Sequence, residues 1–208
     1  KIARAKGHVL YVAKSYTRAA IALADAAKLG PSGGDGESIE DEFHAARATS
    51  RGGNDTTAIA AYDKIAKEHP NGHWGVEASF LAAQLRFLHG HWTDALAAMD
   101  RYLAGPAKLG GQETNAREMK RMRALALLEV GRLAEARTAL RALAKSDAYE
   151  KDSFAQGRLD LLAAIASERM GEKAEAIKTY DRLSGAHPFG WLDIASRARL
   201  AKLGETRA

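Results

Sequence analysis

The chain has 208 residues, with 31 Lys and Arg against 26 Asp and Glu, seven His and no Cys. This length can bury a substantial core as one large domain or two small ones, and the ordinary share of apolar residues argues against intrinsic disorder. The absence of Cys excludes disulfides, thiolate metal sites and a cysteine nucleophile. The net charge of +5 is spread among acidic residues, so we expect no nucleic-acid partner. No apolar run is long enough to span a membrane.

The composition predicts helices, because Ala, Leu, Arg, Lys and Glu dominate while Val, Ile and Thr are scarce. The chain opens on Lys without an apolar signal segment, which indicates a processed protein or an excised piece of a longer one. In chain order, a Gly-rich stretch predicts a flexible loop over 30–37, and a helix is expected after Ser38 with acidic residues in its first turn. Apolar residues recur at helical spacing over 81–88, 121–128 and 158–165. Ten or eleven helices and no sheet are expected.

Turn residues recur at a regular interval, which indicates an internal repeat. The anchors are one Lys and four Gly, at intervals of about 40 residues: Lys14, Gly53, Gly90, Gly131 and Gly171. Five residues after each anchor stands an alanine: Ala19, Ala58, Ala95, Ala136 and Ala176. Seven residues before each anchor stands Gly or Ala, and nine and twelve residues after it stand residues that are mostly larger and apolar.

Each of these positions has a physical reason. A glycine costs least where a helix ends in a left-handed turn, and small side chains let two antiparallel helices approach closely. A proline lies seventeen residues after three of the anchors, and Pro106 lies one residue short of that position after Gly90; a proline there ends the second helix. One such hairpin cannot bury its own apolar face, so the hairpins are expected to stack into a solenoid.

This pattern resembles the tetratricopeptide repeat. The segments 53–62, 90–99 and 171–180 carry the resemblance. The resemblance implies an all-α fold, a right-handed superhelix of about five helical hairpins with a closing helix, over one domain at 1–208. Since the units exceed the usual length of about 34 residues, the additional residues are expected in the loops, notably at 30–37 and 105–114.

The closing segment 187–204 and the phrases at 43–47 and 73–78 resemble the superhelical domain of soluble lytic transglycosylases. That resemblance implies a non-catalytic scaffold in the periplasm or cell envelope, which positions an enzyme or partner acting on peptidoglycan; the cytoplasm is the alternative. The family's catalytic Glu-Ser pair has no counterpart, because Glu37-Ser38 lies in the Gly-rich loop. We therefore expect no enzyme in this chain. An active site of unrecognised type and a free-standing adaptor for peptides are the competing hypotheses.

No cofactor or metal is expected. His69 and His73 straddle Pro70, and His89 and His91 flank an anchor, so neither pair meets the geometry of a metal site. Phe189 and Trp191 are expected to cap the last hairpin.

In tetratricopeptide repeats, ligands usually bind the concave face, which the first helix of each unit lines. Positions six and ten before each anchor are expected to point there, together with two neighbouring residues. The predicted partner-binding residues are Arg4, His8, Phe43, Arg47, Arg51, Phe80, Gln84, Phe87 and Arg121. This mixture suits an acidic peptide or protein segment, or an anionic polymer such as peptidoglycan. The alternative is that these charges are merely solvated.

Overall fold

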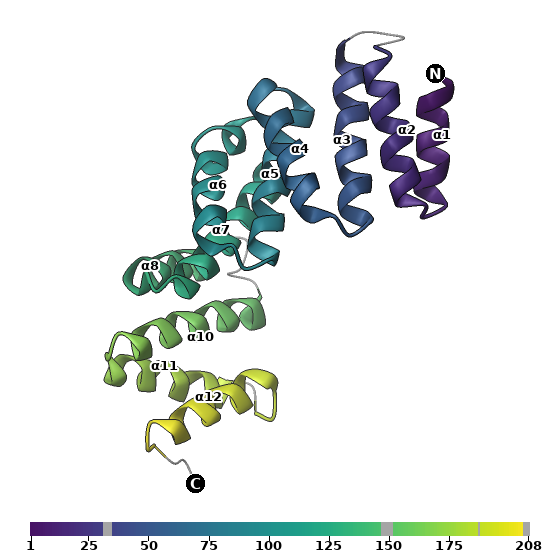
Figure 1. Ribbon diagram of the computed structural model, residues 1–208. Helices are drawn as coiled ribbons and strands as arrows, with labels where there is room; N and C mark the ends of the chain where they lie inside the picture. The colour runs from purple at the N-terminus through teal and green to yellow at the C-terminus, as the bar shows by residue number, and fades with distance from the viewer. Residues whose placement is uncertain (31–34, 147–151, 187, 206–208) are drawn as a thin grey trace. The chain divides into compact units, whose positions relative to one another are not determined.

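The computed structural model describes residues 1–30, 35–146, 152–186 and 188–205 (Figure 1). Within these ranges the chain forms eleven α-helices, one short 3-10 helix and no strand, which confirms the predicted all-α fold. The helices are α1 Ile2–Val12, α2 Tyr16–Lys28, α3 Asp35–Arg51, α4 Asp55–Glu68, α5 His73–Leu88, α6 Trp92–Ala104, η1 Pro106–Lys108, α7 Glu113–Glu129, α8 Leu133–Ala144, α10 Ser153–Arg169, α11 Lys173–Ala186 and α12 Trp191–Lys202. None of the described helices is both long enough and apolar enough to cross a bilayer.

The helices pair into hairpins that follow the predicted repeat. The first helices are α1, α3, α5, α7 and α10, and the second helices are α2, α4, α6, α8 and α11. Two compact units divide the chain, unit 1 over Lys1–Met119 and unit 2 over Lys120–Ala208. The single domain predicted over 1–208 is not tested by this division and stays a prediction.

Every hairpin turns on its predicted anchor. All five anchors have positive φ, between 58° at Lys14 and 88° at Gly53. In each turn the amide after the anchor donates to the carbonyl five residues earlier, as Asn54 does to Thr49, and the anchor amide donates to the carbonyl three residues earlier. This pair of bonds satisfies carbonyls that the helix end leaves without partners, so the same turn closes all five first helices.

Small residues hold the paired helices close together. The alanines five residues after the anchors are all 0% exposed: Ala19, Ala58, Ala95, Ala136 and Ala176. In the first hairpin a Cβ on Gly7 would lie 2.5 Å from Cγ of Leu23, so only glycine fits there. The larger residues nine and twelve positions after the anchor fill the space that remains, as Tyr62 and Ile65 do in the core of the second hairpin.

The connections between hairpins absorb the added length of the repeat. Three residues separate the two helices of every hairpin, whereas the connections after the second helices differ in length. Additional loop residues were predicted over 105–114, and part of this connection between α6 and α7 forms the short helix η1. Residues 31–34 of the predicted flexible loop lie outside the described residues. Its C-terminal part was predicted wrongly, because α3 already begins at Asp35.

The earlier start of α3 changes the surroundings of its acidic residues. Asp41 was expected in the first turn and lies in the second, 1% exposed. Each acidic side chain meets a different partner: Glu40 meets His44, Asp41 meets Arg4, and Glu42 meets Lys64. Helix capping is therefore not their role.

The closing helix α12 packs on α11 and α10, as predicted. Its two flanking aromatic residues do not cap the last hairpin, because Phe189 is 94% exposed and Trp191 is half exposed. Instead the carboxylate of Asp193 accepts one hydrogen bond from the backbone amide of Phe189 and another from the side chain of Arg197. These bonds fix the start of the helix.

Candidate functional site

The strongest candidate for a binding surface is the side of unit 1 formed by the first helices α1, α3 and α5, here called the first-helix face. Four rings meet there across the three helices. The ring of His44 lies 5.5 Å from that of His8 and 5.2 Å from that of Trp74, and Phe43 lies 4.8 Å from Trp74. His8 is exposed, while His44 and Trp74 are half-buried. The rings make a continuous aromatic strip whose edge faces water.

Burial lowers the pKa of His44, and the neighbouring His8 and Arg47 lower it further, against the opposing charges of Glu40 and Asp41. The ring is therefore neutral near pH 7. A neutral imidazole offers one hydrogen-bond donor and one acceptor. The strip can thus contact a flat apolar group and also hydrogen-bond to a peptide backbone.

Of the predicted cations, Arg4 is already committed within the fold. Its Nε and Nη2 donate to both carboxylate oxygens of Asp41 at 2.7–3.0 Å. Nη2 also donates to the backbone carbonyl of Glu37, and Nη1 lies 2.9 Å from the carboxylate oxygen Oε2 of the same residue. Truncating either partner of a buried pair leaves a charge without compensation. Arg4 joins α1 to α3, and it does not offer its charge to a ligand.

Arg47 and Arg51 are exposed on α3, and no described residue pairs with either guanidinium. Gln84 and Phe87 on α5 are half-buried, and α3 contacts α5 directly. The predicted set thus leaves His8, Arg47, Arg51, Gln84 and Phe87 accessible in unit 1. Together they offer two cations beside amide and aromatic groups.

Two predicted residues lie inside the fold instead. Phe43 is 3% exposed and its ring lies 5.6 Å from that of Tyr62 in α4; Phe80 is 8% exposed and contacts Tyr102 in α6 at 5.8 Å. The residue ten positions before the anchor therefore points into the interior in these two hairpins. Phe43 packs against the buried side of Trp74, so it can hold Trp74 in position but is not itself accessible to a ligand.

Arg121 belongs to unit 2. It lines a groove of about 370 Å³ between α7 and α10, together with Arg158 and the apolar side chains of Leu125, Leu159 and Leu162. This groove is also on first helices, and its lining is aliphatic where that of the face in unit 1 is aromatic.

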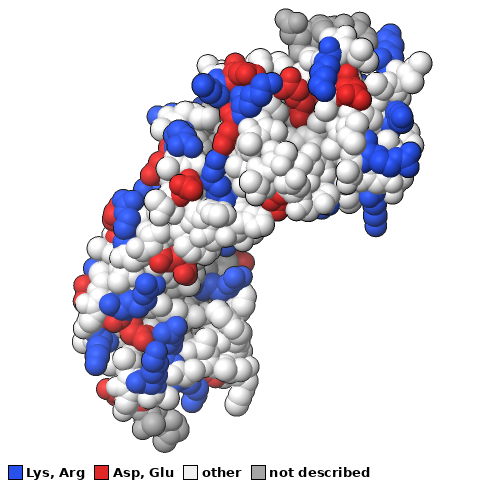
Figure 2. Space-filling model, in the orientation of Figure 1, with Lys and Arg blue, Asp and Glu red and all other residues white. Residues whose placement is uncertain are grey.

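Among the described residues, no group of three or more His, Asp or Glu side chains is placed to hold a metal ion. His89 instead lies 2.6 Å from Asp55, and the carboxylate of Asp55 also accepts a hydrogen bond from Ser50. Figure 2 shows Lys and Arg interspersed with Asp and Glu on the face in view. Such mixing differs from the continuous basic field of a nucleic-acid binder.

The predicted partner-binding residues include neither His44 nor Trp74, although a stacking role for Trp74 on a sugar ring was a minor alternative. His44 stands nine residues before its anchor, one position from the set that was considered, so a helical-wheel projection at the true start of α3 would have included it. Trp74 is in the first turn of α5, and only its contacts with the preceding hairpin reveal its role.

The comparisons with known proteins agree with this repeat register. The model of the tetratricopeptide repeat matches residues 42–72 and 159–189, which start 11 residues before Gly53 and 12 before Gly171. The chain is built of tetratricopeptide-like repeats. No curated protein sequence matches it significantly.

Solved tetratricopeptide-like structures resemble this chain over nearly all of its length. A putative kinesin light chain with nearly identical TPR-like repeats from Podosopora anserina aligns with a TM-score of 0.63 at 16% identity, over 98% of this chain and 97% of that one. The Rap conjugation gene regulator of plasmid pLS20, in complex with the Phr* peptide, aligns with a TM-score of 0.50 at 15% identity, over 97% of this chain and 53% of that one. At these identities the likeness shows the fold alone.

Proposed function

We propose that the chain is a binding module without catalytic activity, which holds a peptide segment of a partner protein on the first-helix face of unit 1. The observation that carries the proposal is the strip of His8, His44 and Trp74 beside Arg47 and Arg51, two cations that have no partner in the described part of the chain. Aromatic rings and arginines are the side chains that dominate binding energy at interfaces. The segment it would hold is extended, with an apolar or aromatic side chain near acidic ones.

The proposal draws support from two further facts. Tetratricopeptide-like hairpins present their first helices as an extended surface. In addition, the similar Rap regulator was solved with a peptide bound. The envelope role, in which the module positions a peptidoglycan-acting enzyme in the periplasm, is the narrower form of this proposal. The comparisons described above lend it no support.

The test is binding to an array of twelve-residue peptides, followed by calorimetric titration of the best peptide. Replacing Arg47 and Arg51 together by Glu is expected to weaken binding by about tenfold or more, because it replaces two charge-assisted contacts with repulsion. Replacing Trp74 by Ala is expected to weaken it as well.

The matched control replaces Lys173 and Lys178, exposed on the second helix α11, by Glu. This variant makes the same change in net charge, so long-range attraction falls equally while the face stays intact. Equal affinity of the Arg47/Arg51 variant and the wild type would refute the site assignment. Cleavage of a peptide or glycan by the purified chain would refute the non-enzymatic role.

A further inference from the structure

Within the described ranges, three grooves of one design lie between neighbouring second helices, away from the first-helix face. Each is walled by two second helices and has the intervening first helix as its floor. The first groove lies among α2, α3 and α4, the middle groove among α4, α5 and α6, and the third groove among α8, α10 and α11. Their volumes are about 370, 420 and 330 Å³.

The lining residues stand at the same positions of the repeat. A lysine fourteen residues after the anchor lines each groove: Lys28, Lys67 and Lys145. Eleven residues after the next anchor, a second cation lines the opposite wall: Lys64, Arg101 and Arg182. The three grooves can therefore be compared side chain by side chain.

Two of the grooves neutralise that second cation internally. In the first groove Lys64 lies 3.0 Å from Glu42, and in the third Arg182 lies 2.6 Å from Asp160. Both carboxylates stand eleven residues before their anchors, on the groove floor. The third groove also holds an ion pair of Arg141 and Glu175 at 2.7 Å.

The middle groove lacks this carboxylate. The corresponding residue is Ser79, whose hydroxyl donates to the carbonyl of Val76. Arg101 is exposed on the wall, and among the described residues neither it nor Lys67 has an ion-pair or hydrogen-bond partner for its side chain. The one carboxylate in the lining, Asp63, is held through both oxygens by Arg86 at 2.5 and 3.1 Å. The middle groove therefore carries an uncompensated positive charge.

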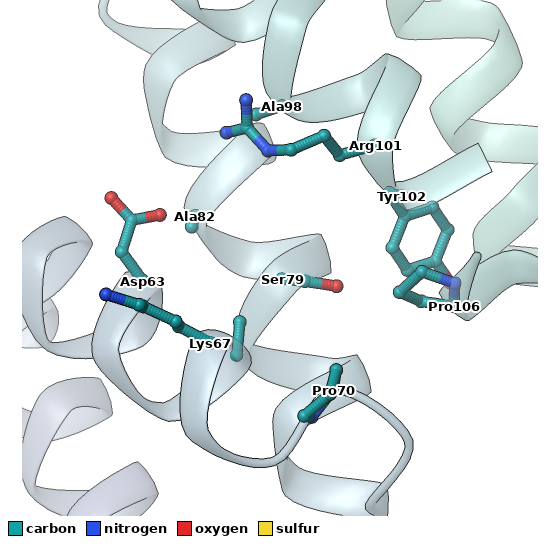
Figure 3. A pocket seen from close by; sticks show the side chains of 10 residues that line it. Asp63, Lys67, Pro70, Ser79, Ala82, Ala98, Arg101, Tyr102 and Pro106 are labelled. Atoms are coloured by element: carbon teal, nitrogen blue, oxygen red, sulfur yellow. The ribbon is translucent and has the colours of Figure 1, made fainter. Parts of the chain in front are cut away.

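Figure 3 shows how these groups lie. In this view Lys67 extends along α4 toward Asp63 and Arg101 extends from α6, with Ala82 of the floor between their charged ends. The remaining lining is mostly apolar, with Pro70 and Pro106 at the end where the ring of Tyr102 stands. The hydroxyl of Tyr102 donates to Gln112, and the ring is only 1% exposed, so it forms part of the base of the groove.

We propose that the middle groove is a second binding site, which takes an Asp or Glu side chain of a partner protein together with an adjacent aliphatic side chain. The partner's carboxylate would occupy the place that Glu42 and Asp160 fill in the sister grooves, and it would bridge Arg101 and Lys67. The aliphatic side chain would pack on the accessible apolar lining of Ala66, Pro70 and Pro106. The volume is within the range of small-ligand sites. This site is separate from the first-helix face and does not rest on the function proposed for it.

The test is a nuclear magnetic resonance titration of the full chain with labelled alanine methyl groups. The probe is the capped dipeptide acetyl-Leu-Glu-amide, and acetyl-Leu-Gln-amide is its uncharged control. The methyl signals of Ala66, Ala82 and Ala98 are expected to shift with the first probe. Those of Ala144 and Ala163 in the third groove are expected to stay in place.

Three variants make the test specific. Ser79→Asp restores the internal carboxylate, as at Asp160, and is expected to lower the affinity for the Glu dipeptide by about tenfold. Arg101→Gln is expected to lower it by a similar factor. Arg182→Gln, the matched change in the third groove, is expected to leave binding at the middle groove unchanged. Because Ser79→Asp copies a pair that the fold already contains, it is expected to fold normally, which circular dichroism checks.

Each of the other outcomes overturns the proposal. Equal shifts with the Gln dipeptide would show that the carboxylate is not recognised. Full binding by Ser79→Asp would show that the missing carboxylate is irrelevant. Tighter binding of acetyl-Leu-Leu with its free carboxylate would assign the groove to a chain terminus instead, and equal shifts with inorganic phosphate would assign it to anions in general.

Discussion

Lys14 occupies the position that glycine takes in the four later hairpins. Its φ of 58° is left-handed, a conformation that costs an L-residue with a Cβ roughly 1–2 kcal/mol. The first hairpin tolerates this because the turn's hydrogen bonds, from Lys14 to Tyr11 and from Ser15 to Leu10, form as in the others. The local backbone is therefore set by the repeat rather than by the residue in it.

Replacing Lys14 by Gly is expected to stabilise the protein by about 0.5–1 kcal/mol, because relief of the left-handed strain outweighs the added freedom of the unfolded chain. Chemical denaturation followed by circular dichroism measures the change. Lys6→Gly, in the exposed middle of α1, is the control and should destabilise by about 1 kcal/mol. A loss of stability in Lys14→Gly would contradict this account of the turn.

At the same scale, the sequence predicted the anchors and the small residues well, because both follow from local geometry. It did not predict the pair of Arg4 and Asp41, whose carboxylate and guanidinium stand 37 residues apart in the chain. That contact depends on where α3 begins and on how α1 packs against it. Neither can be read from the residues themselves.

The hairpin depends on close approach of its two helices. Ala95 in α6 is fully buried, whereas Ala97 in the same helix is exposed. We expect Ala95→Leu to destabilise by about 1–3 kcal/mol, because the added atoms force the helices apart. Ala97→Leu is expected to change stability by less than about 0.5 kcal/mol. Thermal unfolding of the two variants beside the wild type measures both values, and equal melting temperatures would argue against tight packing at this position.

The pH dependence of unit 1 follows from His44 between α1 and α5. Its pKa in the folded protein is below the ordinary 6.5, chiefly because the ring is buried. Below about pH 6.5 the unfolded chain therefore binds a proton that the folded one does not yet bind. The stability is intact above this pH and falls as the pH decreases toward the folded pKa.

Replacing His44 by Gln should remove this part of the pH dependence. We expect the variant to lose less stability than the wild type between pH 7 and pH 5.5. Denaturation midpoints at several pH values give the two slopes. Identical slopes would mean that another group titrates in this window; the carboxylates with lowered pKa, such as Asp55 and Asp193, act only at lower pH.

Across the whole molecule, the described contacts between elements join helices that are adjacent in the chain or one helix apart. Such connectivity makes a repeat easy to predict, because local patterns determine most of the fold. The five hairpins and the closing helix were accordingly within reach of the sequence, whereas the end of the loop predicted over 30–37 was not, because α3 begins at Asp35. The candidate sites were less predictable. Phe43 and Phe80 were placed on the surface by periodicity and are buried, since a helical phase is uncertain by one residue when its start is unknown.

The grooves between second helices were not predicted, because each gathers side chains from three helices. Their common lining becomes visible only when the hairpins are superposed by repeat position. Ser79 is then the exception among Glu42, Ser79 and Asp160. The missing carboxylate at Ser79 is thus a difference between equivalent positions of the repeat, and no single residue signals it.

The three-residue turns inside the hairpins and the connections of variable length between hairpins are expected to differ in how well they tolerate an insertion. A tag or reporter placed within a hairpin turn would disturb the hydrogen bonds that end the first helix. Between hairpins, the stretch around Gly110 has open space about its backbone, and the connections differ in length from repeat to repeat. An epitope or fluorescent label inserted there would leave both neighbouring hairpins paired, so the chain supplies its own attachment point for following a partner.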